Sequence, residues 1–250
     1  MNKEILKLTA ETMMAKPKGL LAMDESSPTC AKRFAALNIP ETEENRRRYR
    51  ELIVTTPNLA DYISGAILFD ETFHQKMSTG QLFRDYLKSI NILPGIKVDA
   101  GAKDFSNHPN EKITEGLEGL RERLANYESL GAKFCKWRGV ITIGDQIPSE
   151  SCIISNCNAL ARYASLCQEN NLVPIVEPEV LINGNHSIEV CDKITRATLK
   201  LQPLPRFNAL MLVPFRNVTN ACKTVSEIFI AGETPCALEF MERDAMVLAQ

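Results

Sequence analysis

The chain has 250 residues, which suits one large domain or two small ones, and its 44% hydrophobic and 24% charged residues are ordinary for a folded globular protein. Its net charge of -2 argues against a protein that binds nucleic acid through a basic surface. No apolar run approaches the roughly 20 residues of a membrane span, and the N-terminal segment has no continuous apolar stretch, so we expect neither a membrane partner nor a signal peptide.

Short apolar runs recur along the first 200 residues, each bounded by Gly, Pro or charged residues. Runs of this length and setting predict buried strands. The predicted strands are Gly19–Met23, Ile63–Phe69, Gly95–Val98, Ala132–Trp137 and Leu172–Val176. Most of these runs end in a polar or charged residue.

Helical patterns lie between the predicted strands. Thr42–Val54 has Thr42 as an N-cap, and Thr114–Leu130 and Ser151–Asn170 each place apolar residues on one face. Strands alternating with helices predict βαβ units and a parallel sheet. About five such units precede residue 200, whereas a closed (β/α)₈ barrel, the TIM barrel, needs eight. The expected fold class is therefore α/β, an incomplete TIM (β/α)₈-type barrel.

The last fifty residues have a different pattern of predicted elements. A proline-rich break at 201–205 precedes a strand at Asn208–Phe215, a helix at Asn217–Ala231 that ends at Gly232, and a strand at Pro235–Met241. This predicts a short C-terminal α+β tail of βαβ type. We expect two parts: a partial barrel over residues 1–202 and an unrelated tail over residues 203–250.

Cysteine and histidine usage predicts neither disulfides nor a metal site. None of the eight cysteines forms a C-x-x-C pair, and we interpret them as reduced thiols among apolar neighbours. The three histidines, far apart and without ligand spacing, are His74, His108 and His186.

Charged residues follow the predicted strands in a pattern that is typical of a catalytic site. The carboxyl ends of the strands of a parallel barrel meet in one space. Packed lysines there can yield a neutral amine nucleophile, carboxylates can move protons, and Lys and Arg suit a phosphorylated substrate. Alternate residues face the same side of a strand. The set is Asp24, Lys97, Lys136, Arg138, Glu177 and Glu179.

Several motifs resemble class I fructose-bisphosphate aldolase, and the resemblance covers roughly residues 4–200. They occur in the family's order: Gly19-Leu-Leu-Ala-Met-Asp-Glu-Ser26, Ala31-Lys-Arg33, Thr42-Glu-Glu-Asn-Arg-Arg47, Gly65-Ala-Ile-Leu-Phe-Asp-Glu-Thr72, Gly95-Ile-Lys-Val-Asp99, Phe134-Cys-Lys-Trp-Arg138, Ala159-Leu-Ala-Arg-Tyr-Ala164 and Val173-Pro-Ile-Val-Glu-Pro-Glu179. The resemblance implies metal-independent cleavage of fructose 1,6-bisphosphate through a lysine Schiff base, in glycolysis, by a cytoplasmic enzyme without a cofactor. It also implies a sugar phosphate as substrate and a homo-oligomer as an assembly to consider.

The resemblance assigns roles to individual residues. Catalytic roles fall to Asp24, which orients the intermediate, Lys136, which aids the Schiff-base lysine, Glu177, the general acid and base, and its partner Glu179. Substrate or phosphate binding falls to Lys32, Arg33, Lys97 and Arg138.

The Schiff-base lysine itself has no counterpart in residues 1–250. The family carries it in a Leu-Leu-Lys-Pro-Asn-Met-like motif, whereas Lys200 precedes Leu-Gln-Pro-Leu-Pro and Lys223 lies in an unrelated predicted helix. The Ser-Gly-Gly phosphate loop and the Tyr-Gly-Arg motif are also missing from this sequence. We therefore expect an aldolase by family whose activity is impaired.

The tail, at about residues 206–250, resembles the C-terminal region of FAD-linked glycolate or D-lactate oxidases. The matching residues are Asn208–Phe215, Ala231-Gly232 and Pro235-Cys-Ala-Leu-Glu-Phe-Met-Glu-Arg-Asp244. That region is not the FAD-binding domain, so no FAD is expected. Three interpretations stay open: an aldolase with impaired activity, an inactive chimeric or truncated fragment, and an oxidase-related module.

Overall fold

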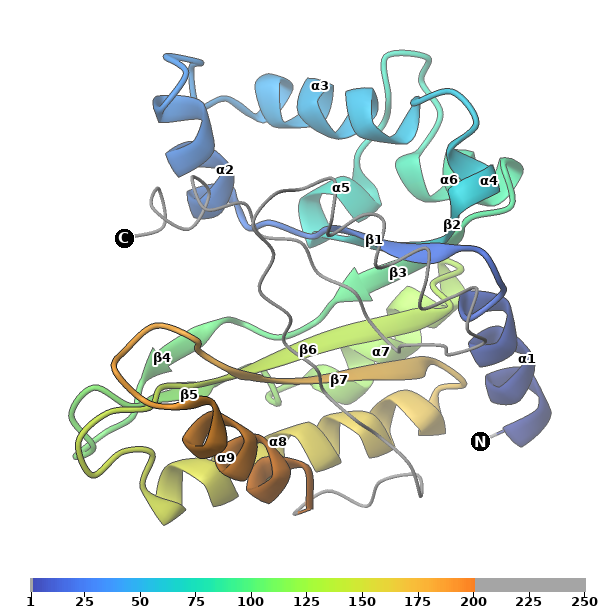
Figure 1. The fold of residues 1–250 in the computed structure, drawn as a ribbon. Coiled ribbons are helices and arrows are strands. Elements are labelled where there is room, and N and C mark those ends of the chain that lie inside the picture. Colours follow the sequence, from blue (N-terminus) through green and yellow to red (C-terminus); the bar gives the residue numbers. More distant parts are fainter. Residues whose placement is uncertain (1, 201–250) are drawn as a thin grey trace.

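One curled parallel sheet organises the protein. In the computed structural model, which describes residues 2–200, its five strands stand in the order β1-β2-β3-β6-β7, all neighbours parallel. The strands are β1 (Gly19–Met23), β2 (Ile63–Leu68), β3 (Leu93–Lys97), β6 (Phe134–Ile141) and β7 (Val173–Val180). The sheet forms the expected incomplete barrel (Figure 1). The predicted tail elements at 208–241 lie outside the described residues.

Helices and one hairpin surround the sheet (Figure 1). Helices α3 to α6 lie above it in this view, and α8 and α9 lie below. The helices are α1 (Lys3–Met13), α2 (Ser27–Ala35), α3 (Glu43–Val54), α4 (Leu59–Tyr62), α5 (Asp70–His74), α6 (Phe83–Ser89), α7 (Leu120–Ser129), α8 (Glu150–Glu169) and α9 (Ile188–Lys200), and the antiparallel hairpin pairs β4 (Ala102–Asp104) with β5 (Lys112–Thr114). None of these described helices combines the length and the apolar character that crossing a membrane requires.

The predicted helix Thr114–Leu130 is wrong over residues 114–119. Thr114 belongs to strand β5, and α7 begins only at Leu120. Two glycines with positive φ, Gly116 at 124° and Gly119 at 60°, intervene. A helix cannot run through this left-handed backbone, which glycine adopts at little cost. Periodicity in the leucines alone did not reveal the break.

The predicted ends of two strands are also wrong. β6 was expected to end at Trp137 and β7 at Val176, but they continue to Ile141 and Val180. The ladder between them pairs Arg138 with Glu177 and Val140 with Glu179. Charged residues therefore lie within these strands rather than after them. By contrast, α3 begins as predicted, because the Thr42 hydroxyl accepts the Asn45 backbone N–H at 3.1 Å.

The main core lies between the sheet and the helices outside it. Cys135 and Trp137 of β6 are fully buried and belong to the same core cluster as Leu160, Tyr163 and Cys167 of α8. The Trp137 and Tyr163 rings lie 5.5 Å apart between centroids. The six cysteines in the described part of the chain are free thiols, and five of them are buried. This agrees with their interpretation as small apolar residues.

A second, smaller core lies on the concave face, around Phe134 at the N-terminal end of β6. Phe134 packs there with Ile67 of β2 and with Met13 at the end of α1. Its ring occupies the space over two glycines on neighbouring strands. A Cβ at Gly65 would lie 2.9 Å from the ring, and a Cβ at Gly95 would lie closer still. These positions must therefore stay without side chains while Phe134 is present.

We expect Gly95→Ala to lower the free energy of unfolding by about 1–3 kcal/mol, because the new methyl group collides with Phe134 and the packed strand cannot give way. Gly19→Ala is the matched control, because a Cβ there meets nothing within 4 Å. Its effect should stay within about 0.5 kcal/mol. Urea titration of the full chain measures both, and equal effects of the two substitutions would contradict this packing argument.

Candidate active site

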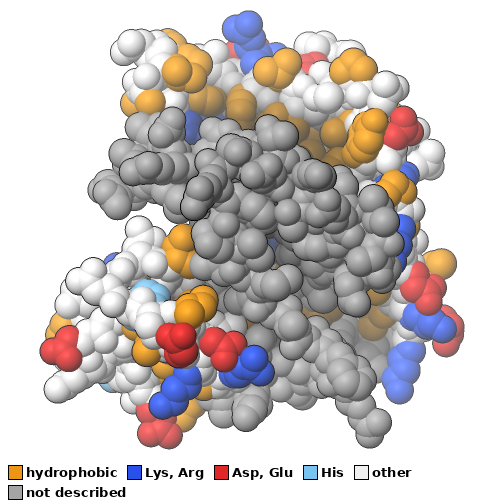
Figure 2. Space-filling model, in the orientation of Figure 1, with side chains coloured by type: hydrophobic (Ala, Val, Ile, Leu, Met, Phe, Trp, Pro, Cys, Tyr) orange, Lys and Arg blue, Asp and Glu red, His pale blue; other side chains and the backbone are white. Residues whose placement is uncertain are grey.

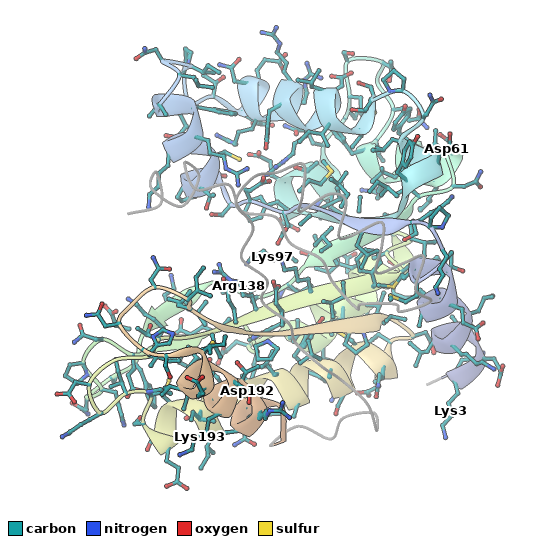
Figure 3. All side chains as sticks on the ribbon, viewed as in Figure 1. Lys3, Asp61, Lys97, Arg138, Asp192 and Lys193 are labelled. Carbon is teal, nitrogen blue, oxygen red and sulfur yellow. The ribbon has the colours of Figure 1, made fainter. Side chains whose placement is uncertain are left out.

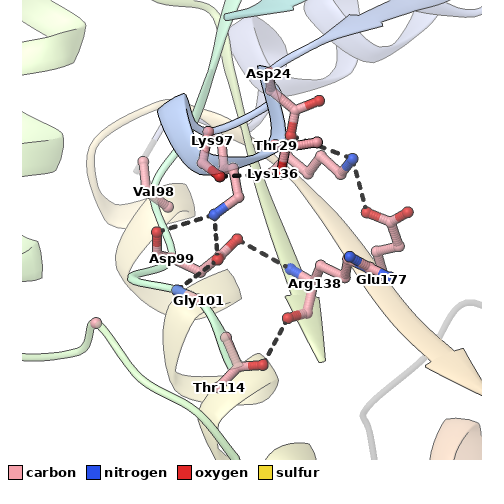
Figure 4. Close-up of polar contacts among 12 residues, drawn as sticks. Asp24, Thr29, Lys97, Val98, Asp99, Gly101, Thr114, Lys136, Arg138 and Glu177 are labelled. Atoms are coloured by element: carbon pink, nitrogen blue, oxygen red, sulfur yellow. Dashed lines mark hydrogen bonds and ion pairs between the residues drawn. The ribbon is translucent and has the colours of Figure 1, made fainter. Parts of the chain in front are cut away.

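An ion-paired lysine lies at the centre of the concave face. Lys136 Nζ lies 3.4 Å from Asp24 Oδ2 and 3.1 Å from Glu177 Oε2 (Figure 4). The side chains of Lys136 and Asp24 are each 11% exposed, and that of Glu177 is 23% exposed. The three groups come from β6, from the residue after β1, and from β7. The sequence predicted that these side chains would meet, and the structure brings them together.

Strand geometry places the neighbouring charges on the same face. Arg138 follows Lys136 by two residues on β6, and Glu179 follows Glu177 by two on β7, so each pair faces one side. Arg138 Nε donates to Glu179 Oε2. The residues between them, Trp137 above all, face the helices instead. Alternation thus separates a charged concave face from an apolar convex one.

Lys97 completes the group of cations, from β3. It is the direct ladder partner of Lys136. Figure 3 shows Lys97 and Arg138 at the middle of the molecule, whereas Lys3, Asp61 and Lys193 lie at its periphery. The Lys97 ammonium does not stand free, because it donates to the carboxylate of Asp99 and, at 3.2 Å, to the Asp99 backbone carbonyl.

Asp99 is a site residue that the sequence argument passed over. Its side chain is only 2% exposed. The carboxylate also accepts the backbone N–H of Gly101 at 3.0 Å and that of Arg138 at 3.3 Å (Figure 4). The available signal was its place two residues beyond Lys97, at the end of a motif that had already been singled out.

The charges of this cluster nearly cancel. Three cations face four carboxylates, and each cation has at least one carboxylate partner among them. Charges as buried as those of Lys136, Asp24 and Asp99 are tolerated only when they are paired or hydrogen-bonded. The members are Lys97, Lys136, Arg138, Asp24, Asp99, Glu177 and Glu179.

Lys32 and Arg33 lie apart from this cluster, on α2. Lys32 is exposed, and Arg33 donates to Glu25 and, at 3.1 Å, to the Tyr49 hydroxyl. The role of Lys32 and Arg33 in binding phosphate stays a prediction. Glu25 also accepts from Arg50, whose side chain is 2% exposed.

The pKa of Glu25 reflects these partners. Burial raises the pKa of this carboxyl, but the positive charge of Arg50, hydrogen bonds and the charge of Arg33 together lower it below its ordinary value of 4.5. Glu25 thus connects the last turn of α2, through Arg33, and the buried guanidinium of Arg50 on α3 to the end of β1.

Elsewhere the described surface mixes both signs of charge. On the face drawn in Figure 2, acidic and basic side chains lie interleaved along the lower edge around α9, where Arg196 pairs with Asp192. Within residues 2–200, no group of three or more His, Cys, Asp or Glu side chains could hold a metal ion.

Comparisons with known proteins identify two matching families. Residues 5–203 match the family model described as fructose-bisphosphate aldolase class-I, and residues 204–250 match that described as FAD linked oxidases, C-terminal domain. The probable fructose-bisphosphate aldolase class 1 of Xanthomonas axonopodis pv. citri is 58% identical over 200 residues, which cover 80% of this chain and 60% of that protein. The cytosolic fructose-bisphosphate aldolase 4 of Arabidopsis thaliana is 51% identical over 182 residues, covering 73% and 46%.

A solved structure shares the fold. A fructose-bisphosphate aldolase from Plasmodium falciparum, crystallised in a ternary complex, superposes with a TM-score of 0.75 at 46% identity, covering 79% of this chain and 59% of that one. The chain thus spans about 60% of the length of the first curated relatives that it matches.

We expect Glu25→Gln to lower the free energy of unfolding at pH 7 by about 3 kcal/mol, because it leaves the buried Arg50 without its counter-charge. The folded-state pKa of Glu25 lies below 4.5, so its contribution is present above that value and is lost as the pH falls through the lowered pKa. The substitution should therefore flatten the acid side of the stability profile, measured by urea titration from about pH 6 to 3.

Glu128→Gln, on the exposed face of α7, is the matched control and should leave that profile unchanged. If the free energy of unfolding falls equally steeply with decreasing pH in the unmutated chain and in Glu25→Gln, this assignment is contradicted.

Proposed function

The chain belongs to the class I fructose-bisphosphate aldolase family, and from this premise we propose that residues 1–202 carry the acid–base part of a Schiff-base aldolase site. The reaction of that site is metal-independent cleavage of fructose 1,6-bisphosphate to dihydroxyacetone phosphate and glyceraldehyde 3-phosphate. The observation that carries this proposal is Lys136 held between Asp24 and Glu177 on the concave face.

The cluster suits the proton transfers of this chemistry. Imine formation adds an amine to a carbonyl and expels water, and cleavage moves a hydroxyl proton. Glu177 has 23% of its side chain exposed, so it can reach a substrate while bonded to Lys136. Asp24 lies across the ammonium from it and can accept a proton from a substrate hydroxyl. Glu179 holds Arg138 in place for an anionic group.

Nucleophilic attack is the step that this chain is least equipped for. A lysine attacks a carbonyl only as a neutral amine. Lys136 pairs with two carboxylates and Lys97 with one, so both side chains are already engaged in ion pairs. No Schiff-base motif of the family occurs in residues 1–250. We therefore propose that cleavage by this polypeptide is impaired.

Phosphate binding is expected to be weak for a related reason. The cations of the cluster are already neutralised, so a bisphosphate must displace carboxylates or draw on cations outside it. Arg138 and Lys97 are the proposed phosphate contacts from the described residues. Lys32 and Arg33, on the helix that follows β1, are proposed to add charge at the mouth of the site.

Residues 203–250 are proposed to be a segment of separate origin. Support comes from the two family matches, which meet between residues 203 and 204. The second match makes an oxidase-related module the alternative function. It spans a C-terminal domain only, and the proposal includes no FAD. A cytoplasmic location and homo-oligomer formation are proposed from the family, the former supported by relatives described as cytosolic and cytoplasmic.

Imine trapping tests the proposed impairment. The full chain is mixed with dihydroxyacetone phosphate and borohydride, and its intact mass is measured. We expect no covalent adduct under conditions that label a complete class I aldolase fully, because the family's Schiff-base motif is missing from residues 1–250 and both lysines of the cluster are ion-paired. The sole tryptophan, Trp137, reports by its fluorescence that the protein stays folded.

Two outcomes would count against the proposal. An adduct that maps to Lys136 or Lys97 would show that a surrogate nucleophile exists and would overturn the impairment. Calorimetry with fructose 1,6-bisphosphate tests the site itself: we expect weak binding that Lys136→Ala reduces further. Binding that is unaffected by this substitution would overturn the assignment of the site.

A further inference from the structure

Two lysines at the same level of adjacent strands pose an electrostatic problem. Lys97 and Lys136 are direct ladder partners, so their backbones are about 4.8 Å apart and both side chains leave on the concave face. If both side chains extended in parallel, their positive charges would repel each other.

Asp99 resolves this problem for Lys97. The Lys97 ammonium bends toward Asp99 and donates to both its carboxylate and its backbone carbonyl. The ammonium of Lys136 points instead to Asp24 and Glu177 (Figure 4). The ion pairs of Lys97 and of Lys136 are therefore made with different carboxylates.

The backbone fixes Asp99 in this position. Its carboxylate accepts the N–H of Gly101 and the N–H of Arg138, which lies on β6 beyond the last ladder pair between β3 and β6. A side chain that is 2% exposed and bound on three sides has little freedom to turn away. The other charged groups that face this point from the packed strands are Asp24, Lys136, Arg138, Glu177 and Glu179.

We propose that Asp99 is a positioning residue that keeps Lys97 a hydrogen-bonded cation and so bars it from forming imines with carbonyl compounds. This role rests on the proposed function, in which Lys97 binds the substrate and a different lysine forms the Schiff base. It assigns Asp99 to selectivity between lysines, acting through Lys97 and not on the substrate.

Reductive methylation with formaldehyde and cyanoborohydride tests this role, and the assay does not depend on whether the protein binds a sugar phosphate. A neutral lysine amine adds to formaldehyde and loses water to give an imine, which hydride from cyanoborohydride reduces to the N-methyl amine. Peptide mass spectrometry gives the rate for each lysine. In the unmutated chain we expect Lys97 to react about tenfold more slowly than the exposed Lys3, because its charge-assisted hydrogen bonds must break first.

Asp99→Asn removes the counter-charge and keeps an oxygen for one of the two backbone N–H groups, because Gly101 and Arg138 donate to different carboxylate oxygens. We expect methylation of Lys97 to rise about tenfold in this variant, while Lys3 and Lys136 keep their rates. Asp61→Asn, the same substitution at an exposed residue of α4, is the matched control and should change no rate. Asp99→Glu, which keeps the charge, should leave Lys97 slow.

An unchanged Lys97 rate in folded Asp99→Asn would overturn the role of Asp99. If Asp99→Asn unfolds, which Trp137 fluorescence would show, the unmutated chain still decides: Lys97 reacting as fast as Lys3 overturns the proposal. Failure of the proposed function would give a different result: the unmutated chain would not bind fructose 1,6-bisphosphate in calorimetry, but Lys97 would still be methylated more slowly than Lys3.

Discussion

The contact between Lys136 and Asp24 depends on how strongly the sheet curls. Asp24 follows β1, and Lys136 lies on β6, three strands away in the sheet order. Three strand spacings would separate them by about 14 Å in a flat sheet, yet the charged atoms are 3.4 Å apart. Glu177 on β7 reaches the same ammonium, so one lysine connects the two outer strands of the described sheet. The curvature creates the site, and the ion pairs in turn hold the curvature.

The fold was predictable where local pattern and tertiary setting agree. Apolar runs located all five sheet strands, because each strand contains a short apolar run bounded by Gly, Pro or charged residues. Strand ends were missed where the pattern changed from apolar to charged, since β6 and β7 continue through Arg138 and Glu179 to line the concave face. The hairpin of β4 and β5 was missed because three-residue strands leave almost no periodicity to detect.

The site was predictable to a similar degree. Period-two alternation within Lys136–Arg138 and Glu177–Glu179 correctly placed each pair on one face. Partner choice was not predictable, because it depends on the reach of side chains across the curl. The sequence suggested two packed lysines with a lowered proton affinity, whereas the structure gives Lys97 its own carboxylate, Asp99. Asp99 lay in a quoted motif but was given no role, because the sequence does not show that its side chain folds back onto Lys97.

Phe134 over Gly65 and Gly95 has a consequence for how this sequence can change over time. The Phe134 ring on β6 and the two glycines on β2 and β3 form one packing unit, because the ring fills the space that side chains at the glycines would need. A side chain at either glycine is acceptable only after the ring has shrunk, and a smaller ring alone leaves a void beneath Lys136. Related sequences should therefore exchange these three positions together or keep all three, which makes them a covarying unit with no catalytic group among them.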